Sequence, residues 1–340
     1  MNTVLQQFGL DEKNCTVMLY GSGLINNTWL IQDHRSEEKF ILQRINHKIF
    51  RYPEDIAFNT RRVADYLKQY HPAYLFISPL QTLAGSDLVK IDDAYFRIFP
   101  FVNDSHSIDV VEKPEQAFEA AKQFAGFSKV LSGLDASQLK ITLPDFHNLK
   151  LRIDQFKNSL ETGNKERIRQ SKKMIGFIEQ QKNILKEYDQ CKKDFKIRCM
   201  HHDCKISNVL FDKDDIGLCV IDLDTLMPGY FISDVGDMMR TYLSAASEDE
   251  RDLSKIKVRK EFYDAIVKGY LSEMGAELSG FEKEQFHFAG KFMIYMQAIR
   301  FLTDYINNDI YYGSKYETQN FERAANQVTL LKQLIEFNPC

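Results

Sequence analysis

The chain changes character close to residue 100, and this change constrains its fold more than any other feature. Before it, short apolar runs are separated by glycine or charged turn residues, which is typical of hairpins and sheets. After it, apolar residues recur at helical spacing over long stretches. The chain has 340 residues, enough for two units. The sequence therefore predicts a small unit over residues 1–100 and a larger one over residues 101–340.

The first unit is expected to be mainly β-structure with one helix. Strands are expected at residues 16–20, 27–32, 40–45, 87–91 and 95–99. Pro53 suits the first turn of a helix, and apolar residues such as Val63 and Leu67 follow at helical spacing. We expect that helix to end near Tyr70.

The second unit is expected to be largely helical. An amphipathic helix is predicted over residues 114–131, and long, well-solvated helices are predicted over the Lys-, Glu- and Gln-rich residues 153–196. Short apolar runs and clustered acids interrupt the helical pattern over residues 199–240. The helical pattern returns at residue 259. The acid-rich interruption is where we expect the chemistry to lie.

Composition excludes several classes of protein. The 44 Lys and Arg and 48 Asp and Glu residues give a net charge of −4, which provides no general basic field for nucleic acid. No apolar run approaches the roughly 18 residues that span a bilayer, and the first residues lack the pattern of a secretory signal. The six cysteines form no CxxC pair, which favours reduced thiols and a cytoplasmic location.

The segment HHDCKISN at residues 201–208 is the strongest chemical motif. It fits the pattern H-x-D-x-K-x-x-N, and an apolar run ending in Asp222 follows it. Phosphoryl transfer from ATP needs a carboxylate near the acceptor hydroxyl, oxygen ligands for Mg²⁺ and a cation near the phosphoryl group. Asp203 suits the base, and Asn208 and Asp222 suit Mg²⁺. Lys205 lies two residues after Asp203, so on an extended loop it points to the same side.

A zinc site is the rival interpretation of this segment. His201, His202 and Cys204 all carry atoms that bind zinc. Ligands this close together lack the spacing of a structural zinc site, however, and no second pair follows them. The sequence therefore favours phosphoryl transfer.

Gly21, Ser22 and Gly23 lie between the first two expected strands. A glycine-rich hairpin lets backbone N–H groups approach phosphates closely, although many such turns are only hairpins. The pattern G-x-x-x-x-G-K-[ST] of a Walker A loop is absent. The next strand carries Arg44, which we expect to bind the ATP phosphates. The order of strands, glycine loop, cation and helix is that of a kinase N-terminal lobe.

In kinases that this order of elements resembles, that cation pairs with an acid on the following helix. Phe58 occupies the position where the acid is expected. Glu54 and Asp55 are the substitutes that the sequence offers, and it leaves the choice between them open.

Nearly the whole chain resembles the aminoglycoside phosphotransferase and choline kinase superfamily, which are small-molecule kinases. Within it, the resemblance is closest to the branch of N-acetylhexosamine 1-kinases. It rests on GSGLINNTWL (21–30), FILQRIN (40–46), FHNLKLR (146–152), HHDCKISNVLFD (201–212), VIDLDTLMPG (220–229), DVGDMMR (234–240) and IRFLTDYINNDIYY (299–312). The resemblance implies an α+β, protein-kinase-like fold of two lobes, with a small β-rich N-lobe and a larger, mostly helical C-lobe.

The resemblance also implies roles for single residues. Asp203 and Lys205 would be catalytic, and Asp234 would support the catalytic loop. Mg²⁺ would be held by Asn208 and Asp222, with Asp224 helping through water or a second ion. ATP would be bound by Gly21, Ser22, Gly23, Arg44 and, in the adenine hinge, Phe99 and Phe101. The sugar would be contacted by Asn27, Asp203, Arg300 and Tyr311.

The implied reaction is ATP- and Mg²⁺-dependent phosphorylation of the anomeric hydroxyl of an N-acetylhexosamine, giving the sugar 1-phosphate. Another hexose, choline or an aminoglycoside stays open as acceptor, because Asp304 and Asp309 offer acids to a cationic substrate. A non-catalytic pseudokinase is less expected, since the base and metal ligands are present. A protein kinase is not expected, because the D-F-G and A-P-E landmarks are missing. The sequence leaves the choice between monomer and dimer open.

Overall fold

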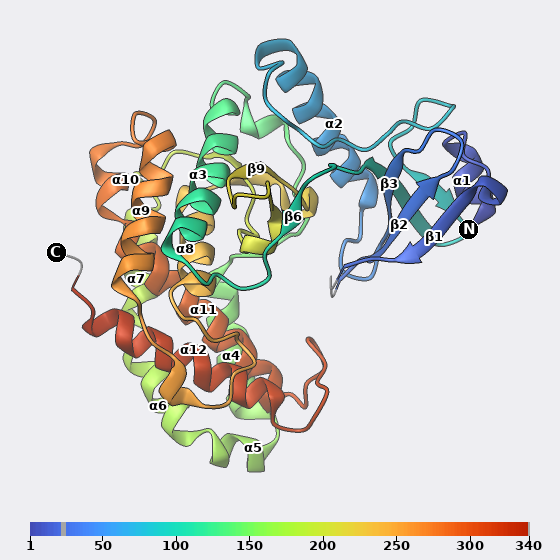
Figure 1. Ribbon diagram of the computed structural model, residues 1–340. Coiled ribbons are helices and arrows are strands. Elements are labelled where there is room, and N and C mark those ends of the chain that lie inside the picture. The colour runs from blue at the N-terminus through green and yellow to red at the C-terminus, as the bar shows by residue number, and fades with distance from the viewer. Residues whose placement is uncertain (22–24, 339–340) are drawn as a thin grey trace.

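The computed structural model describes residues 1–21 and 25–338. Its N-terminal part is a five-stranded antiparallel sheet in the order β1-β2-β3-β5-β4 (Figure 1). The strands are β1 (Cys15–Leu19), β2 (Asn27–Asp33), β3 (Lys39–Ile45), β4 (Val89–Ile91) and β5 (Ala94–Pro100). These strands confirm the five runs that the sequence predicts. The division of the chain at residue 100 stays a prediction.

The two faces of this sheet have different neighbours. Helix α1 (Asn2–Gln7) covers one face, where Leu5 joins a buried cluster with Ile31 and Leu42. Successive residues of a strand point to opposite faces. Arg44 therefore lies on the same face as Leu42, and Gln43 lies on the other face, toward the rest of the protein.

Helix α2 (Pro53–Tyr70) has the bounds that the sequence predicts, with proline at its first position. Its Asn59 is buried and bonds to the C-terminal part of the chain. Asn59 Nδ2 donates to the carbonyl of Lys140 at 2.9 Å and to that of Leu226 at 2.8 Å. Asn59 Oδ1 accepts from the backbone N–H of Lys140 at 2.8 Å. Helix α2 thus joins the N-terminal sheet to the larger part of the protein (Figure 1).

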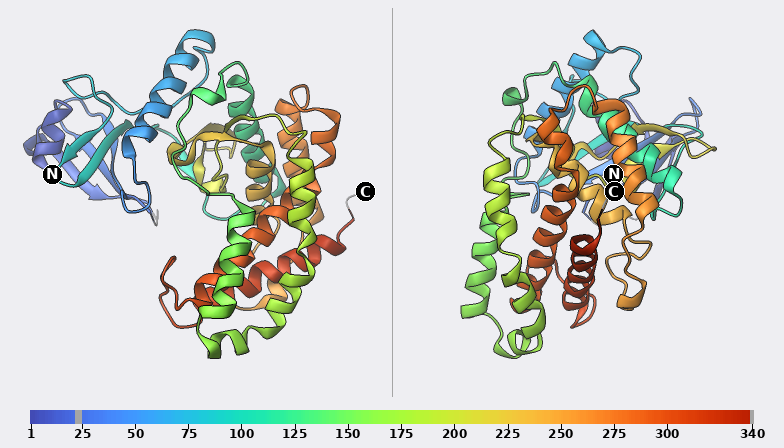
Figure 2. Two further views of the ribbon diagram at one scale, coloured as in Figure 1. Left: turned by 180° about the vertical axis from the view of Figure 1, so that it is seen from behind. Right: turned by 90° about the vertical axis from the view of Figure 1, so that its left-hand side faces the viewer.

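The C-terminal part is built of helices around one large apolar core. They are α3 (Pro114–Val130), α4 (Leu149–Thr162), α5 (Lys165–Gln170), α6 (Lys172–Gln180), α7 (Asn183–Cys191), α8 (Phe231–Tyr242), α9 (Lys260–Met274), α10 (Gly280–Glu284), α11 (Phe286–Ile306) and α12 (Gln319–Glu336). Helix α11 lies at the centre and contacts α4, α7, α8 and α12. Figure 2 shows α4 to α7 running beside α11 and α12.

Glycine allows the closest of these helix contacts. Helices α3 and α9 pack closely where Gly269 meets α3. A Cβ atom at Gly269 would lie 2.3 Å from the carbonyl oxygen of Phe118 and 3.1 Å from the Cβ of Ala121. Because backbone cannot give way at such a distance, any side chain here would separate the two helices.

Short strands lie between the helical core and the N-terminal sheet (Figure 1). Strands β6 (His106–Ser107), β8 (Val209–Phe211) and β9 (Gly217–Val220) form one small sheet, and β7 (Arg198–Met200) pairs with β10 (Met227–Gly229). The 3₁₀ turns are η1 (Glu12–Asn14), η2 (Ala136–Gln138), η3 (Ile206–Asn208), η4 (Leu223–Thr225) and η5 (Leu253–Lys255). The motif-bearing residues 201–208 connect β7 to β8.

The prediction of long helices over residues 153–196 is wrong in one respect, because four shorter helices, α4 to α7, occupy the region. Gly163 ends α4, and Asn164 caps the next helix. The Oδ1 atom of Asn164 accepts from the backbone N–H groups of Glu166 at 3.0 Å and Arg167 at 3.2 Å. A side chain that caps a helix start so well favours a break over a continuous helix.

No helix within residues 1–21 and 25–338 has the length and hydropathy needed to cross a bilayer. The cysteines at 15, 191, 199, 204 and 219 form no disulfide, and Cys340 lies outside the described residues. A cytoplasmic location stays a prediction.

Candidate functional site

Residues 201–208 form a loop that closes on Asp203. The Nδ2 atom of Asn208 donates to the backbone carbonyl of Asp203 at 2.8 Å and to its Oδ2 atom at 3.1 Å. The Nζ atom of Lys205 lies 3.1 Å from the same Oδ2 atom. The structure thus brings together Asp203, Lys205 and Asn208, the three polar residues that the motif singles out.

Two buried carboxylates of α8 accept hydrogen bonds from the backbone of this loop. Asp234 accepts hydrogen bonds from the backbone N–H groups of His201 at 3.2 Å and His202 at 2.8 Å. Asp237, one turn later, accepts from the N–H of Cys204 at 2.8 Å. Burial raises the pKa of Asp234 to about 6, although His201 and these N–H donors oppose the rise. Asp234 therefore occupies the supporting position that the sequence predicts.

The sequence analysis missed Asp237 and Tyr242 as supports of the loop. Tyr242 donates through its hydroxyl to the carbonyl of Cys204 at 2.6 Å. Asp237 follows Asp234 by three residues, so both carboxylates face the loop from one side of α8. That spacing within DVGDMMR is the pattern that predicts a second support.

Asp222 lies beside Asn208 because β8 and β9 pair directly after the loop. The backbone N–H of Ile221 donates to the carbonyl of Asn208 at 2.9 Å, and Asp222 follows in a left-handed conformation with φ 61°. A non-glycine residue in this region is uncommon and is found at functional sites. Burial raises the pKa of Asp222 to about 7, and Asp224 and Asp203 raise it further, whereas Lys205 opposes them.

The donor set of this corner fits Mg²⁺. The amide nitrogen of Asn208 is occupied by Asp203, which leaves its oxygen for a cation. Among the residues that the structure describes, none forms a hydrogen bond or ion pair with the carboxylate of Asp222. Mg²⁺ prefers such oxygen ligands and completes its shell with water and phosphate. The negative charges of Asp222 and Asp203 also attract a divalent cation.

Unlike Asp222, Asp224 has a partner for each of its two carboxylate oxygens. Its Oδ1 atom lies 2.5 Å from Nη2 of Arg97, and its Oδ2 atom accepts from Nδ2 of Asn26 at 2.7 Å. Both Arg97 and Asp224 are almost fully buried. The expectation that Asp224 helps to bind metal is therefore not supported, because each of its oxygens already has a partner in the N-terminal part.

Arg44 does not lie on the face of the sheet that meets the catalytic loop. In the sheet, Gln43 stands directly opposite Arg97, and Arg44 stands opposite Phe96. Arg97 donates through Nε and Nη2 to Oε1 of Gln43 at 3.1 and 2.8 Å and reaches Asp224 from that face. Arg44 points to the other face, which α1 covers. The cation that the structure brings near residues 201–208 is therefore Arg97, and Arg44 is not brought there, because a shift of one residue along a strand reverses the face on which a side chain lies.

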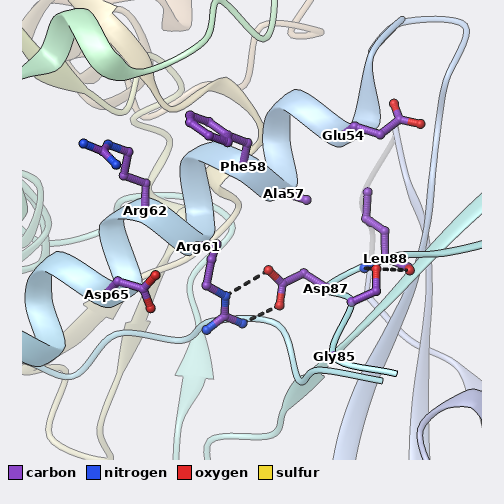
Figure 3. Close-up of a pocket in the computed structure, with 10 residues that line it drawn as sticks. Glu54, Ala57, Phe58, Arg61, Arg62, Asp65, Gly85, Asp87 and Leu88 are labelled. Atoms are coloured by element: carbon purple, nitrogen blue, oxygen red, sulfur yellow. Dashed lines mark hydrogen bonds and ion pairs between the residues drawn. The ribbon is translucent and has the colours of Figure 1, made fainter. Parts of the chain in front are cut away.

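The acid partner predicted for Arg44 is also absent. No ion pair within the described part of the chain joins Arg44 to Glu54 or Asp55. Glu54 and Phe58 instead line a surface hollow of about 460 Å³ between α2 and residues 85–88 (Figure 3). An ion pair between Arg61 and Asp87 lies in that hollow, whose lining includes none of the residues Asp203, Lys205, Asn208 and Asp222. The hollow is therefore separate from the candidate active site.

The remaining N-terminal predictions divide between the two faces of the sheet. Gly21 has φ 77°, a conformation that favours glycine, whereas Ser22 and Gly23 lie outside the described residues. Phe99 shares the face of Arg97, whose guanidinium lies 4.9 Å from the Phe99 ring centroid. Asn27 pairs with Arg44 in the sheet and shares its face, so the structure does not bring Asn27 to Asp203.

Phe101 follows the last strand of the sheet. Its ring lies edge-on to Tyr20 with centroids 6.1 Å apart, and its backbone N–H donates to the carbonyl of Lys39 at 3.0 Å. The roles of Phe99 and Phe101 at an adenine ring stay predictions.

Arg300 and Tyr311 lie together at the C-terminal end of α11. The Nη2 atom of Arg300 donates to the Tyr311 hydroxyl at 3.4 Å, and the Arg300 guanidinium lies 5.7 Å from the centroid of Phe146. Phe146 stacks on His147 at 4.3 Å, and the rings of His147 and His202 are 5.5 Å apart. Because His202 precedes Asp203, a continuous wall of side chains joins Arg300 to the catalytic loop.

Two histidines of this wall share one hydroxyl. The Nδ1 atoms of His147 and His202 lie 2.5 and 2.7 Å from Oγ of Ser233. Burial lowers the pKa of His202 to about 4, although the Met227 carbonyl opposes the shift. Burial and the neighbouring His202 lower the pKa of His147 as well. Both rings are therefore neutral at pH 7.

The same contacts leave His201 and His202 little freedom to bind zinc. His201 Nε2 lies 2.9 Å from the carbonyl of Ile221, and His202 Nδ1 is held by Ser233. Burial raises the pKa of the Cys204 thiol well above its usual value, which disfavours the thiolate that zinc needs. Within residues 1–21 and 25–338, no cluster of three or more His, Cys, Asp or Glu side chains is arranged to hold a metal.

Solved structures of small-molecule kinases share this fold. A spectinomycin phosphotransferase in complex with ADP and spectinomycin has a TM-score of 0.61 at 11% identity, over 99% of this chain and 98% of that one. The GDP complex of an aminoglycoside 2′-phosphotransferase variant has a TM-score of 0.57 at 11% identity, over 98% and 95%. An ethanolamine kinase of Plasmodium vivax has a TM-score of 0.55 at 12% identity, over 92% and 82%.

The sequence itself matches one protein family over most of its length. The match runs from residue 16, in β1, to residue 281, in α10, and so includes the sheet, the catalytic loop and the Asp222 corner. The fold of a small antiparallel N-lobe and a helical C-lobe, which the sequence predicts, is confirmed. Because this match covers well over half of the chain, the chain belongs to the phosphotransferase enzyme family.

Proposed function

We propose that this protein is an ATP- and Mg²⁺-dependent kinase that phosphorylates the anomeric hydroxyl of an N-acetylhexosamine. The observation that carries the proposal is the assembly of Asp203, Lys205, Asn208 and Asp222 at one corner of the helical lobe. Phosphoryl transfer depends mainly on positioning and on charge stabilisation, and these four side chains supply both.

Asp203 is the proposed general base. Its carboxylate accepts the proton of the sugar hydroxyl while that oxygen attacks the terminal phosphorus of ATP. Asn208 orients the carboxylate through a 3.1 Å hydrogen bond. Burial alone would lower the pKa of Lys205, but Asp203 and Asp222 raise it overall, so Lys205 keeps its charge for the transferring phosphoryl group.

Asn208 and Asp222 are the residues that would hold Mg²⁺. The ion supplies neutralisation of the charge that develops on the phosphate oxygens. Asp222 repels its acidic neighbours in the present arrangement, since Asp224 and Asp203 both raise its pKa. A bound cation relieves this repulsion, which couples metal binding to the assembly of the site.

Arg97 takes the role first expected of Arg44. It is the buried guanidinium on the inner face of the N-terminal sheet, and its partner Asp224 is two residues from the metal ligand Asp222. Arg guanidinium groups bind phosphate in a forked geometry. We infer that Arg97 contacts the phosphates of the nucleotide, with Gly21 and its hairpin covering them and Phe99 and Phe101 near the adenine.

The choice of nucleotide and acceptor draws on the resemblance and on the neighbours. ADP is bound by the spectinomycin phosphotransferase, and GDP by the aminoglycoside phosphotransferase variant. The segments around Arg300 and Tyr311 resemble the sugar-contacting segment of N-acetylhexosamine 1-kinases. A planar guanidinium beside aromatic faces suits a sugar that carries hydroxyls and an acyl group.

The proposal is tested by measuring ADP release with Mg²⁺·ATP and a panel of acceptors. The panel contains N-acetylglucosamine, N-acetylgalactosamine, glucose, galactose, choline and kanamycin. We expect turnover with an N-acetylhexosamine and a product whose phosphate is labile to acid, as is typical of a phosphate on the anomeric carbon. Turnover with choline or kanamycin alone would support the assigned base and metal site but would contradict the assignment of an N-acetylhexosamine as acceptor. If no acceptor of the panel gives ADP release, a non-catalytic role is favoured.

A further inference from the structure

Three successive residues, Asp224, Thr225 and Leu226, each contact a different part of the molecule. Asp224 bonds to side chains of the N-terminal part. Thr225 donates through its hydroxyl to the carbonyl of His201, in the catalytic loop, at 2.6 Å. The carbonyl of Leu226 accepts from Nδ2 of Asn59, in α2, at 2.8 Å. We call residues 224–226 the junction, because the N-terminal part, the catalytic loop and α2 all bond to it.

Asn26 connects the junction to two strands of the N-terminal sheet. Its Nδ2 atom donates to Oδ2 of Asp224 at 2.7 Å, and its Oδ1 atom accepts from the backbone N–H of Asn46 at 3.0 Å. Asn26 directly precedes β2, and Asn46 directly follows β3. A backbone N–H only donates and an ionised carboxylate only accepts, so the two ends of the Asn26 amide have fixed roles. One amide thus ties the paired ends of two strands to the junction.

The other oxygen of Asp224 fixes the orientation of Arg97. Oδ1 of Asp224 lies 2.5 Å from Nη2 of Arg97. Oε1 of Gln43 accepts from Nε and Nη2 of Arg97 at 3.1 and 2.8 Å. In the part of the chain that the structure describes, the third nitrogen, Nη1, forms no hydrogen bond. Nη1 is therefore the arm of the guanidinium that remains for a nucleotide phosphate.

The ion pair between Arg97 and Asp224 is withdrawn from solvent. Only 3% of the Arg97 side chain and 2% of the Asp224 side chain are exposed. Separating the two groups inside the protein would leave each charge buried without a partner, which is strongly unfavourable. Asp224 therefore holds Arg97 in one place relative to the catalytic loop.

We infer that Asn26 and Asp224 are positioning residues that dock the N-terminal sheet onto the catalytic loop in the arrangement that binds the nucleotide phosphates. Asn26 acts through the ends of β2 and β3, and Asp224 acts through the guanidinium of Arg97. The inference rests on the proposed function only for the binding of ATP, and it does not depend on which acceptor is phosphorylated.

A reciprocal exchange of the two side chains tests the inference. Asn26→Asp keeps an acceptor for Asn46 but places two carboxylates together. Asp224→Asn removes the charge that holds Arg97. The combined variant, Asn26→Asp with Asp224→Asn, has the net charge of the wild type and can form the same hydrogen bond with donor and acceptor reversed. Binding of Mg²⁺·ADP is measured by calorimetric titration, and the KM for ATP is measured beside the KM for the acceptor.

Each single variant should weaken ADP binding about tenfold or more, because a charge-assisted hydrogen bond is lost or replaced by repulsion. The KM for ATP should rise by a similar factor, while the KM for the acceptor changes less than about twofold. The combined variant should recover to within about threefold of the wild type, because the two sites are coupled. Gln81→Glu, the same kind of change at an exposed position of the N-terminal part, should alter none of these quantities.

The outcomes separate this inference from the proposed function. If the wild type binds ADP and the single variants bind it equally well, the inference is overturned and the proposed kinase stands. Failure of the combined variant to recover, or an equal rise of both KM values in the single variants, also overturns the inference. If no acceptor is phosphorylated but ADP binding follows the expected order, the inference is supported and the proposed function fails. A wild-type protein that binds no nucleotide overturns both.

Melting temperatures close to wild type show that the variants are folded. Asn26→Ala serves where Asn26→Asp does not fold. It removes both hydrogen bonds of the amide without adding a charge, so it should also weaken ADP binding about tenfold. Unchanged ADP binding by folded Asn26→Ala overturns the inference.

Discussion

The catalytic loop and the N-terminal sheet position their charged side chains in different ways. In the loop, Lys205 and Asn208 both contact Asp203, which is close to them in sequence, and buried Asp234 fixes the backbone of His201 and His202. In the sheet, the face on which a charge lies depends on register. There Arg97 meets Asp224, while Arg44 points away. Local motifs are therefore good predictors of the first region and poor predictors of the second.

The largest expected effect comes from replacing Asp203, the proposed general base in the loop. Asp203→Asn removes the proton acceptor but keeps the size and most hydrogen bonds of the side chain. We expect kcat to fall about 10²- to 10⁴-fold, with sugar binding by titration nearly unchanged. Asp214→Asn, at an exposed turn after the loop, serves as control. Near-normal turnover of Asp203→Asn would remove Asp203 from the mechanism.

The next effect removes the support of the loop. Asp234→Ala leaves the buried N–H groups of His201 and His202 without their acceptor. We expect the free energy of unfolding to fall by about 3–4 kcal/mol, since each unsatisfied buried group costs about 1–3 kcal/mol. Asp234→Asn, which keeps one oxygen acceptor, should lose less. Urea unfolding measures both, and equal losses would show that the hydrogen bonds are not the cause.

Acid should destabilise the row of aromatic side chains that joins Arg300 to residues 201–208. The pKa of His202 in the folded protein is about 4, below the usual 6.5, so the unfolded chain binds this proton more readily. The stability that neutral His202 contributes is present above pH 6.5 and is lost as the pH falls toward 4, by about 3 kcal/mol in total. Unfolding at several pH values measures this slope. His202→Asn should flatten it, whereas His71→Gln, at the end of α2, should not.

The smallest expected effect concerns the N-terminal sheet and compares Arg97 with Arg44. Arg97→Ala should raise the KM for ATP about ten- to hundredfold, because charged hydrogen bonds of this kind contribute about 1.5–3 kcal/mol. Arg44→Ala changes an exposed side chain on the other face and should alter that KM less than about twofold. The reverse ranking would show that the sheet presents Arg44 to the nucleotide.

Much of the architecture follows from the sequence alone. Pro53 and the apolar spacing after it give the bounds of α2, and the alternating runs give the strands of the sheet. The catalytic motif places Asp203 with Asn208 because the residues are close in sequence. Asp222 follows, since the pairing of β8 with β9 brings it back to the loop.

Other parts of the site depend on contacts between distant segments. Whether Arg44 or Arg97 faces the helical lobe is decided by the packing of α1 on the sheet, and a strand pattern with charges on it does not reveal this. The partners of Asp224, Arg97 and Asn26, come from the other lobe. Asp304 and Asp309 read as free acids in the sequence, yet backbone N–H groups and Arg167 occupy them in the fold.

The most direct test of the central claim is to identify the product. Purified protein is incubated with Mg²⁺·ATP and N-acetylglucosamine, and the product is examined by phosphorus-detected NMR. The account predicts a phosphate coupled to the anomeric proton, formed by the wild type and not by Asp203→Asn. A phosphate on any other oxygen, or product formed equally by Asp203→Asn, would contradict it.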